Sequence, residues 1–241
     1  MKKVLFTSAL LVSLIGSAQT RVNFTAGMNV SNLTSDLISE YGFDDFREAY
    51  IALGGSATSE VRNSVRVGFY ISALADFYLN ESMFIRSGLK FQNTGDSYYF
   101  STNDVVLVSG NTETDERYKW RQRLGYLSIP VNIGKLASDK VTLYGGLTPS
   151  LNVANITKLN YFEADGDDVK IKWEKGDTYE PRNMLVFLNG GMNFLFPGGS
   201  VEYFFDLGFN YSLSSVYDDP AGGDLNSANA WQFDIGFGVR L

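Results

Sequence analysis

Alternation of apolar and polar residues with a period of two most constrains the fold of this chain. It is clearest at residues 230–241, where one parity holds six large apolar residues: Trp231, Phe233, Ile235, Phe237, Val239 and Leu241. Successive side chains of an extended strand point to opposite faces, so this segment predicts a strand with one apolar and one polar face. An apolar face this long and aromatic is typical of a strand that crosses a lipid bilayer in a β-barrel.

Seven earlier segments show the same alternation, with varying clarity. They cover residues 22–33, 64–78, 83–93, 118–133, 141–154, 182–196 and 201–213. Each is long enough for the roughly 9–11 residues of a tilted bilayer strand. The connections are alternately long and short, as in outer-membrane barrels with long extracellular loops and short periplasmic turns. The sequence therefore predicts an all-β fold, an eight-stranded antiparallel up-and-down transmembrane barrel with four long extracellular loops.

The N-terminus has the three parts of a secretory signal peptide. Lys2 and Lys3 form a short cationic region, residues 4–15 form an apolar run, and small residues at 16–18 precede Gln19. The apolar run is too short to span a bilayer as a helix. We therefore expect a signal peptide at residues 1–18 and a barrel domain at residues 19–241. Loss of Lys2 and Lys3 would change the formal net charge from −7 to −9.

Two kinds of eight-stranded barrel differ in whether their apolar side chains point into the barrel or away from it. In a soluble barrel such as a lipocalin, apolar side chains fill the interior, whereas in a membrane barrel they face lipid. The export segment and the long aromatic faces favour the membrane arrangement. The residues predicted to face lipid are Leu127, Ile129, Val131, Phe205, Leu207, Phe209, Phe233, Ile235 and Phe237.

The opposite parity carries charges of both signs and predicts the contents of the barrel interior. The interior of a barrel with only eight strands is filled by side chains, so we expect a lumen charge network that plugs the barrel. A conduction path along the same residues is the alternative. In the last strand, Gly236 lies on the inward parity and Phe237 on the outward parity. We therefore expect the Gly236→Ser variant to be tolerated and the Phe237→Arg variant to disturb the lipid-facing surface. The predicted network consists of Arg66, Asp76, Arg86, Lys90, Glu202, Asp206, Asp234 and Arg240.

Composition excludes several classes of function. The 241 residues include no histidine and no cysteine, which removes Ser-His catalysis, thiolate chemistry and disulfide bonds. An excess of 27 acidic over 20 basic residues argues against nucleic-acid binding. The acidic stretch at residues 163–168 lacks the spacing of an EF-hand loop, and solvated loop charge explains it better than a calcium site. The sequence therefore predicts a protein that is not an enzyme and has no cofactor or metal site.

Three local features carry expectations of their own. Residues 44–53 form either a short helix that begins at Asp44 or an irregular loop. Pro130 lies on the interior parity of a strand, where a bulge or local break has to accommodate it. Arg121 and Arg123 lie beyond the apolar part of the same strand, and either contact anionic lipid headgroups or are ordinary extracellular charges.

Short motifs spread over the chain resemble those of a known family. They are the strand at residues 26–33, a Tyr-Leu-x-Ile-Pro sequence at 126–130, a Gly-Gly-x-x-Pro sequence at 145–149 and Ser-Ala-Gln at 17–19. In these motifs the chain resembles the Bacteroidota outer-membrane β-barrel family of porin-family or PorT-family proteins. The resemblance implies an integral outer-membrane protein in contact with outer-membrane lipid and lipopolysaccharide. It implies no defined activity.

Three functions remain compatible with the sequence. The first is a structural or interaction protein, because the four long connections hold 21 of the 27 acidic residues. The second is an accessory subunit of a secretion machine, as in the branch of the resembling family that contributes to type IX secretion, in contact with other outer-membrane proteins. The third is a narrow channel for small solutes.

Overall fold

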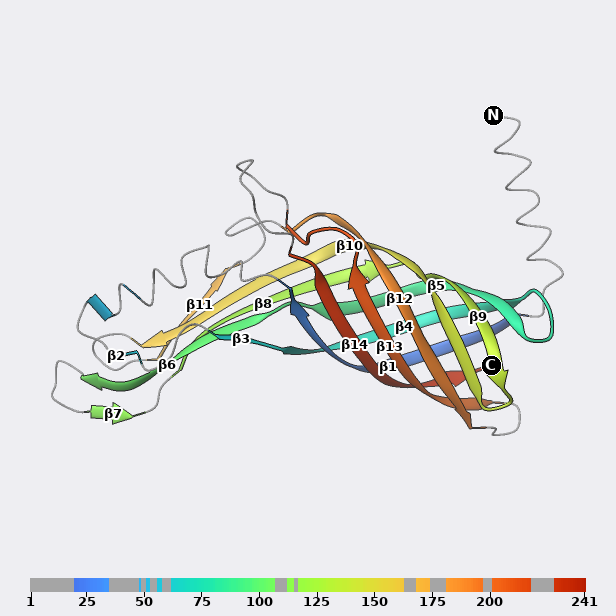
Figure 1. The fold of residues 1–241 in the computed structure, drawn as a ribbon, viewed down its shortest axis with the longest axis horizontal. Helices are drawn as coiled ribbons and strands as arrows, with labels where there is room; N and C mark the ends of the chain where they lie inside the picture. Colours follow the sequence, from blue (N-terminus) through green and yellow to red (C-terminus); the bar gives the residue numbers. More distant parts are fainter. Residues whose placement is uncertain are drawn as a thin grey trace, which may run out of the picture.

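The computed structural model describes residues 20–34, 48, 51–52, 56–57, 62–106, 112–114, 117–162, 168–173, 181–196, 201–217 and 228–241. Within these residues the strands close into an antiparallel barrel of eight staves (Figure 1). One stave consists of two strands, β8 and β9. In order around the barrel the staves are β1 (Thr20–Leu33), β4 (Arg66–Tyr78), β5 (Met83–Thr94), β8 (Arg117–Ser128) with β9 (Val131–Ser138), β10 (Val141–Phe162), β12 (Met184–Phe196), β13 (Glu202–Ser212) and β14 (Ala230–Arg240).

The last strand closes the barrel by pairing with the first. Strands β1 and β14 are in register from Asn23 opposite Arg240 to Leu33 opposite Ala230. Since an unpaired backbone group in lipid costs several kcal/mol, closure is what allows such a sheet to span a membrane. We call the end with the short β4–β5, β9–β10 and β12–β13 connections the turn end, and the opposite end the loop end.

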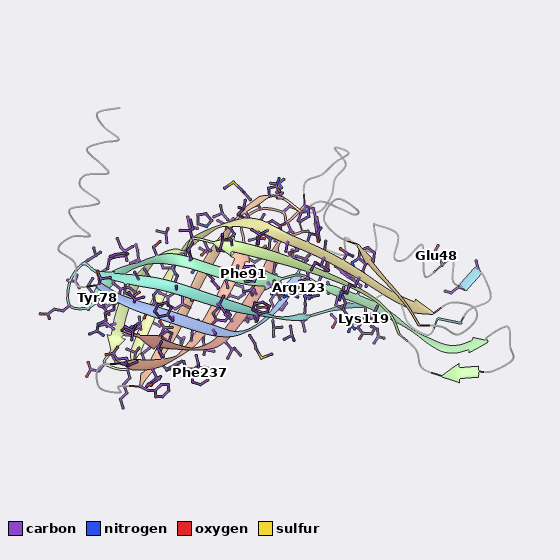
Figure 2. The ribbon with its side chains drawn as sticks, turned by 180° about the vertical axis from the view of Figure 1, so that it is seen from behind. Glu48, Tyr78, Phe91, Lys119, Arg123 and Phe237 are labelled. Carbon is purple, nitrogen blue, oxygen red and sulfur yellow. The ribbon has the colours of Figure 1, made fainter. Side chains whose placement is uncertain are left out.

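Outward and inward side chains alternate as the sequence predicts. In β14, Phe233, Ile235 and Phe237 are exposed on the outer surface, while Gln232 and Asp234 are buried inside. Figure 2 shows the outer side chains along the barrel, with Phe237 pointing away from it. Of the nine residues predicted to face lipid, seven are exposed. The other two, Phe205 and Leu207, are half-buried on the same surface.

Pro130 interrupts one stave without opening the barrel. Strand β8 ends at Ser128 and β9 starts at Val131, so Ile129 and Pro130 form the local break that the missing N–H of proline requires. The amide of Ile129 still donates to the carbonyl of Pro149 in β10, at 2.9 Å. The sequence predicts a connection at residues 134–140, but the observed turn is shorter. Strand β9 continues to Ser138 and stays paired with β5 and β10 almost to its end.

Several strands continue beyond the loop end as a curved sheet, which we call the sheet extension (Figure 1). Beyond Leu151, β10 leaves β12 and pairs only with β8 and β11. The prediction of polar loops at residues 94–117 and 155–181 is therefore wrong for much of each segment. Strand β11 does alternate, with Val169, Ile171 and Trp173 on one parity, but its six residues are fewer than the roughly 9–11 of a bilayer strand. The extension adds to β8 and β10 the strands β2 (Ser56–Ala57), β3 (Arg62–Ser64), β6 (Ser97–Val106), β7 (Thr112–Thr114) and β11 (Asp168–Trp173).

Helix is scarce in the described part of the chain. Glu48, Ile51 and Ala52 are helical, within the short helix considered for residues 44–53, whose other positions lie outside the described residues. The predicted signal peptide and residues 163–167 of the acidic stretch also lie outside them. No described helix has the length and apolar character needed to cross a bilayer.

Candidate functional site

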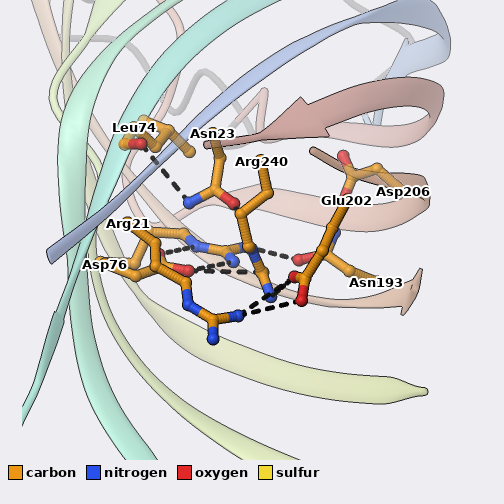
Figure 3. A network of polar contacts seen from close by, with 9 residues as sticks. Arg21, Asn23, Leu74, Asp76, Asn193, Glu202, Asp206 and Arg240 are labelled. Carbon is orange, nitrogen blue, oxygen red and sulfur yellow. Dashed lines mark hydrogen bonds and ion pairs between the residues drawn. The ribbon is translucent and has the colours of Figure 1, made fainter. Parts of the chain in front are cut away.

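Three buried charged residues form what we call the interior ion-pair cluster, Asp76, Arg86 and Arg240, near the turn end (Figure 3). Arg86 donates to both carboxylate oxygens of Asp76, at 2.7 Å from Nε and 3.0 Å from Nη2. Arg240 Nη2 lies 3.4 Å from Asp76 Oδ2. The amide oxygens of Asn23 and Asn193 accept from Arg240 Nε and Arg86 Nη1, each at 2.7 Å. Because all three charges are almost completely buried, these partners are what offset their desolvation.

A second, more exposed pair lies at the rim of the turn end. Arg21 Nη1 lies 3.1 Å from Glu202 Oε2, and the side chains of this pair are 39% and 31% exposed. Arg240 Nη1 lies 3.7 Å from the same carboxylate oxygen and connects the rim to the interior cluster. Glu202 is therefore part of the predicted network, but it lies at the solvent-facing end and not in the interior.

Asp206 connects the cluster to the middle of the barrel. Its carboxylate accepts hydrogen bonds from the hydroxyls of Tyr70 at 2.7 Å and Tyr144 at 2.9 Å. It also accepts from Asn193 Nδ2 at 2.6 Å. Since Asn193 accepts from Arg86 as well, the two groups share one continuous hydrogen-bond network.

Lys90 and Asp234 form the third buried charge pair. Lys90 Nζ lies 2.6 Å from Asp234 Oδ2 and 4.9 Å from the centroid of the Tyr70 ring. Asn210 and Gln232 also donate to the Asp234 carboxylate. These contacts come from strands far apart in the sequence, so the pair ties opposite walls of the barrel together.

The middle of the barrel is closed to solutes. Three buried cations and three buried anions line the interior from the turn end to the middle, and a pocket among them has a volume of about 30 Å³. A water molecule occupies about 30 Å³ in the liquid, so this space suits bound water rather than a solute path. These six buried charged residues are Arg86, Lys90, Arg240, Asp76, Asp206 and Asp234.

An apolar plug closes the loop end of the interior. The segment after β13 folds inward, with a hydrogen bond of 2.7 Å from the Arg182 amide to the Val216 carbonyl. Sequence reasoning missed this plug, and the signal was the weak alternation of β12, where Leu185 and Phe187 occupy the inward parity. The plug consists of Leu33, Leu124, Tyr126, Leu185, Phe187, Val216, Tyr217, Ala228 and Ala230.

Arg66 is the member of the predicted network that the structure places elsewhere. It lies at the loop end, at the start of β4, away from the three buried ion pairs. Its electrostatic neighbours are Asp96, which attracts it, and Arg121 and Arg123, which repel it. The period-2 pattern assigned it to the correct parity, but the pattern carries no information on depth within the barrel.

Aromatic rings cover glycines on other strands, and this overturns one expectation. A Cβ atom on Gly236 would lie 2.3 Å from the Tyr70 hydroxyl and 2.9 Å from the Ala26 carbonyl oxygen. Phe84 covers Gly134 in the same way. Serine at Gly236 is therefore not the neutral change that the parity alone predicts, because no space remains beneath the Tyr70 ring.

Asp96 is a buried carboxyl group at the loop end, in the connection between β5 and β6. Burial raises its pKa to about 7, although the Tyr98 hydroxyl and the Arg66 charge oppose this shift. The folded protein therefore holds this proton more tightly than the unfolded chain, in which the pKa is near 3.8. It follows that the contribution of Asp96 to stability is greatest below pH 4 and is lost as the pH rises to about 7.

We expect the Asp96→Asn variant to be more stable than the wild type at pH 8 and equally stable near pH 4. A shift of about three pKa units corresponds to a difference of about 4 kcal/mol at pH 8. The measurement is urea unfolding of both proteins in phospholipid vesicles over this pH range. The difference between their free energies of unfolding is compared at each pH, so that the contributions of other titrating groups cancel. A difference that stays constant from pH 4 to pH 8 would contradict the assignment.

The described residues form no cluster suited to metal binding. No group of three or more potential metal-ligating side chains occurs among them. The carboxylates of Asp76, Asp206 and Asp234 are held by cations, amides and tyrosine hydroxyls of the barrel itself. What this arrangement does chemically is to fill and cross-link the interior.

Comparisons with known proteins agree with this architecture. The family described as outer membrane protein beta-barrel domain matches residues 17–218. Among solved structures, Ail, the attachment invasion locus protein of Yersinia pestis, is 13% identical with a TM-score of 0.44, over 92% of this chain and 99% of Ail. OprG from Pseudomonas aeruginosa is 11% identical with a TM-score of 0.40, over 93% of this chain and 97% of OprG. No curated protein matches the chain.

The family match spans well over half of the chain, and its description agrees with the closed barrel of eight staves. The fold class predicted from the alternation is therefore confirmed, while the narrower likeness to Bacteroidota proteins stays a prediction. This chain belongs to the outer membrane protein beta-barrel domain family and is a small barrel protein of the outer membrane.

Proposed function

We propose that this protein is a non-enzymatic barrel that acts as a structural or interaction protein at the cell surface, through its sheet extension and acidic loops. The observation that carries the proposal is the length of β10, which has 22 residues where a bilayer crossing takes roughly 9–11. At about 3.3 Å per residue, the part of β10 beyond Leu151 is roughly 35 Å long when measured along the strand. Paired strands of that length form a platform that a partner can contact.

The filled interior supports this role over that of a small-solute channel. Six buried charges and the apolar plug occupy the space that a solute would need. Export through a cleaved signal peptide at residues 1–18, and kinship with the porin-family and PorT-family proteins of Bacteroidota, belong to the same proposal. They are supported by the N-terminal pattern and by the motifs at residues 126–130 and 145–149.

The purified wild-type barrel should produce no steady current in a planar lipid bilayer. The interior ion pairs and the plug lie in series along the barrel axis, so an ion would have to displace both. An open porin reconstituted in the same way is the control for insertion and recording. Steady currents of porin size from the wild-type protein would favour the channel function instead.

Two single-cysteine variants test both the orientation and the interaction role, since the chain has no cysteine of its own. Lys170→Cys lies in β11 of the sheet extension, and Asp139→Cys lies in the turn between β9 and β10. On intact cells, a membrane-impermeant maleimide should label only Lys170→Cys. A photo-cross-linker attached there should yield discrete adducts with envelope proteins.

Labelling of Asp139→Cys alone would reverse the orientation. Labelling of Lys170→Cys without any cross-linked adduct would leave the barrel with a structural role and remove the interaction role.

A further inference from the structure

Cations line the outer face of the barrel where it continues into the sheet extension. Lys119, Arg121 and Arg123 share the outward parity of Leu127 in β8, and Lys158 lies on the adjacent part of β10. We call Arg121, Arg123 and Lys158 the basic strip. Figure 2 shows Phe91, Arg123 and Lys119 in that order from the barrel toward the extension. A local excess of positive charge is unexpected in a chain with a formal net charge of −7.

The basic strip is electrostatically unfavourable as it stands. Arg121 and Lys158 are directly opposite each other in the β8–β10 pairing, and like charges at such positions are destabilising. The positive charge of Arg66 on β4 adds to this repulsion, because it interacts unfavourably with both Arg121 and Arg123. Within the described part of the chain, the ion pairs involve none of the three strip residues. An external anion would relieve this repulsion.

The depth of the strip indicates which anion this is. Leu127 belongs to the exposed apolar surface and lies opposite Phe91 of β5. Arg123 is four residues further along β8, which is about 10 Å along the barrel axis for a strand tilted by roughly 40°. Its guanidinium carbon lies 5.4 Å from the centroid of the Phe69 ring, which in turn contacts Phe91. The strip therefore lies where the hydrocarbon layer ends and the lipid headgroups begin.

An apolar hollow runs from this position over the outer surface of the barrel. Its volume is about 690 Å³, and it forms because Ala26 and Ala73 are small while their neighbours are large. Phe91 lines the hollow and also contacts Phe69 beneath Arg123, so the hollow and the strip are continuous. The hollow is lined on either side of the two alanines by Phe24, Ile71, Phe91 and Phe237.

We propose that the basic strip and the hollow together bind one phosphorylated glycolipid of the outer leaflet, of the lipid A class. Arg121, Arg123 and Lys158 hold its phosphate groups, and its acyl chains occupy the hollow. Arginine suits this role because its guanidinium binds phosphate through two parallel hydrogen bonds. This site depends on the proposed function only for the orientation of the barrel, which places the loop end in the outer leaflet.

The test compares two double variants with the same loss of charge. Arg121→Gln/Lys158→Gln removes the opposed pair of the strip, and Lys135→Gln/Lys140→Gln removes two exposed cations at the turn end. Binding of bisphosphorylated lipid A to each purified barrel in detergent micelles is measured by native mass spectrometry. The strip variant should bind at least tenfold more weakly than the wild type, and the turn-end variant should change by less than twofold.

A second arm uses only the wild-type protein and remains informative if a variant folds poorly. Dephosphorylated lipid A should bind at least tenfold more weakly than the bisphosphorylated form. Inorganic phosphate should not displace the bound lipid, because it has no acyl chains. Equal binding of both lipids, displacement by free phosphate, or equal losses in the two double variants would each overturn the site. Micelles have no sidedness, so a reversed orientation in the labelling experiment would refute the orientation without affecting this result.

Discussion

The Asp76→Ala variant should lose about 3–5 kcal/mol in its free energy of unfolding, the largest loss that we expect from one substitution in this protein. Asp76 is fully buried and is the carboxylate that pairs with both Arg86 and Arg240 in the interior ion-pair cluster. Its removal leaves two guanidinium groups inside the barrel, with neutral amides, aromatic rings and, for Arg240, the rim carboxylate of Glu202 to stabilise them. The measurements are urea unfolding in phospholipid vesicles and the shift in gel mobility on heating.

Glu202→Ala is the matched control, because it removes a carboxylate that also contacts Arg240 but lies at the solvent-facing rim. Exposed pairs contribute at most about 1 kcal/mol, so this variant should stay close to the wild type. The double variant Asp76→Ala/Arg86→Ala should cost less than the sum of its two single variants, since both single changes break the same Asp76–Arg86 pair. Similar losses from Asp76→Ala and Glu202→Ala would contradict the central position of Asp76.

The Ile235→Arg variant should lose about 2–4 kcal/mol, the second large effect, because it places a charge near the middle of the bilayer. Ile235 lies midway along β14, where its neighbours on the adjacent strands are Met28 and Leu207. Leu241→Arg is the control at the turn end, where the cost of a charge falls to about 0–1 kcal/mol.

This comparison separates depth in the membrane from exposure. Ile235 is 52% exposed and Leu241 is 60% exposed, so surface accessibility alone predicts similar effects or the opposite order. The free energy of unfolding in phospholipid vesicles measures the difference. Equal costs at the two positions would show that the apolar surface around Ile235 does not lie in the hydrocarbon layer.

The two effects have different physical origins, although the residues involved are close together. The interior is expensive to disturb because buried charges there depend on specific partners, as Asp76 does. The exterior tolerates exchange among apolar residues but not a charge, because lipid solvates any hydrocarbon surface and stabilises no ion. One barrel wall therefore separates two environments with opposite requirements.

The sequence by itself determined the eight staves, the closed barrel and the direction in which most side chains point. Alternation is a local property, since each residue of an extended strand points opposite to its neighbours whatever the strand pairs with. The outward position of Phe233 and the inward position of Asp234 follow from this rule alone. So does the need for a break at Pro130, because the missing N–H belongs to the residue itself.

Only the tertiary structure decided which inward residues meet. Asp76 pairs with Arg240 through the closure of the barrel, which brings β14 within one strand of β4. The plug around Phe187 and the lack of space at Gly236 also depend on residues from other strands. Period-2 patterning records the face on which a side chain lies, whereas contacts depend on register, tilt and the shape of side chains across the lumen.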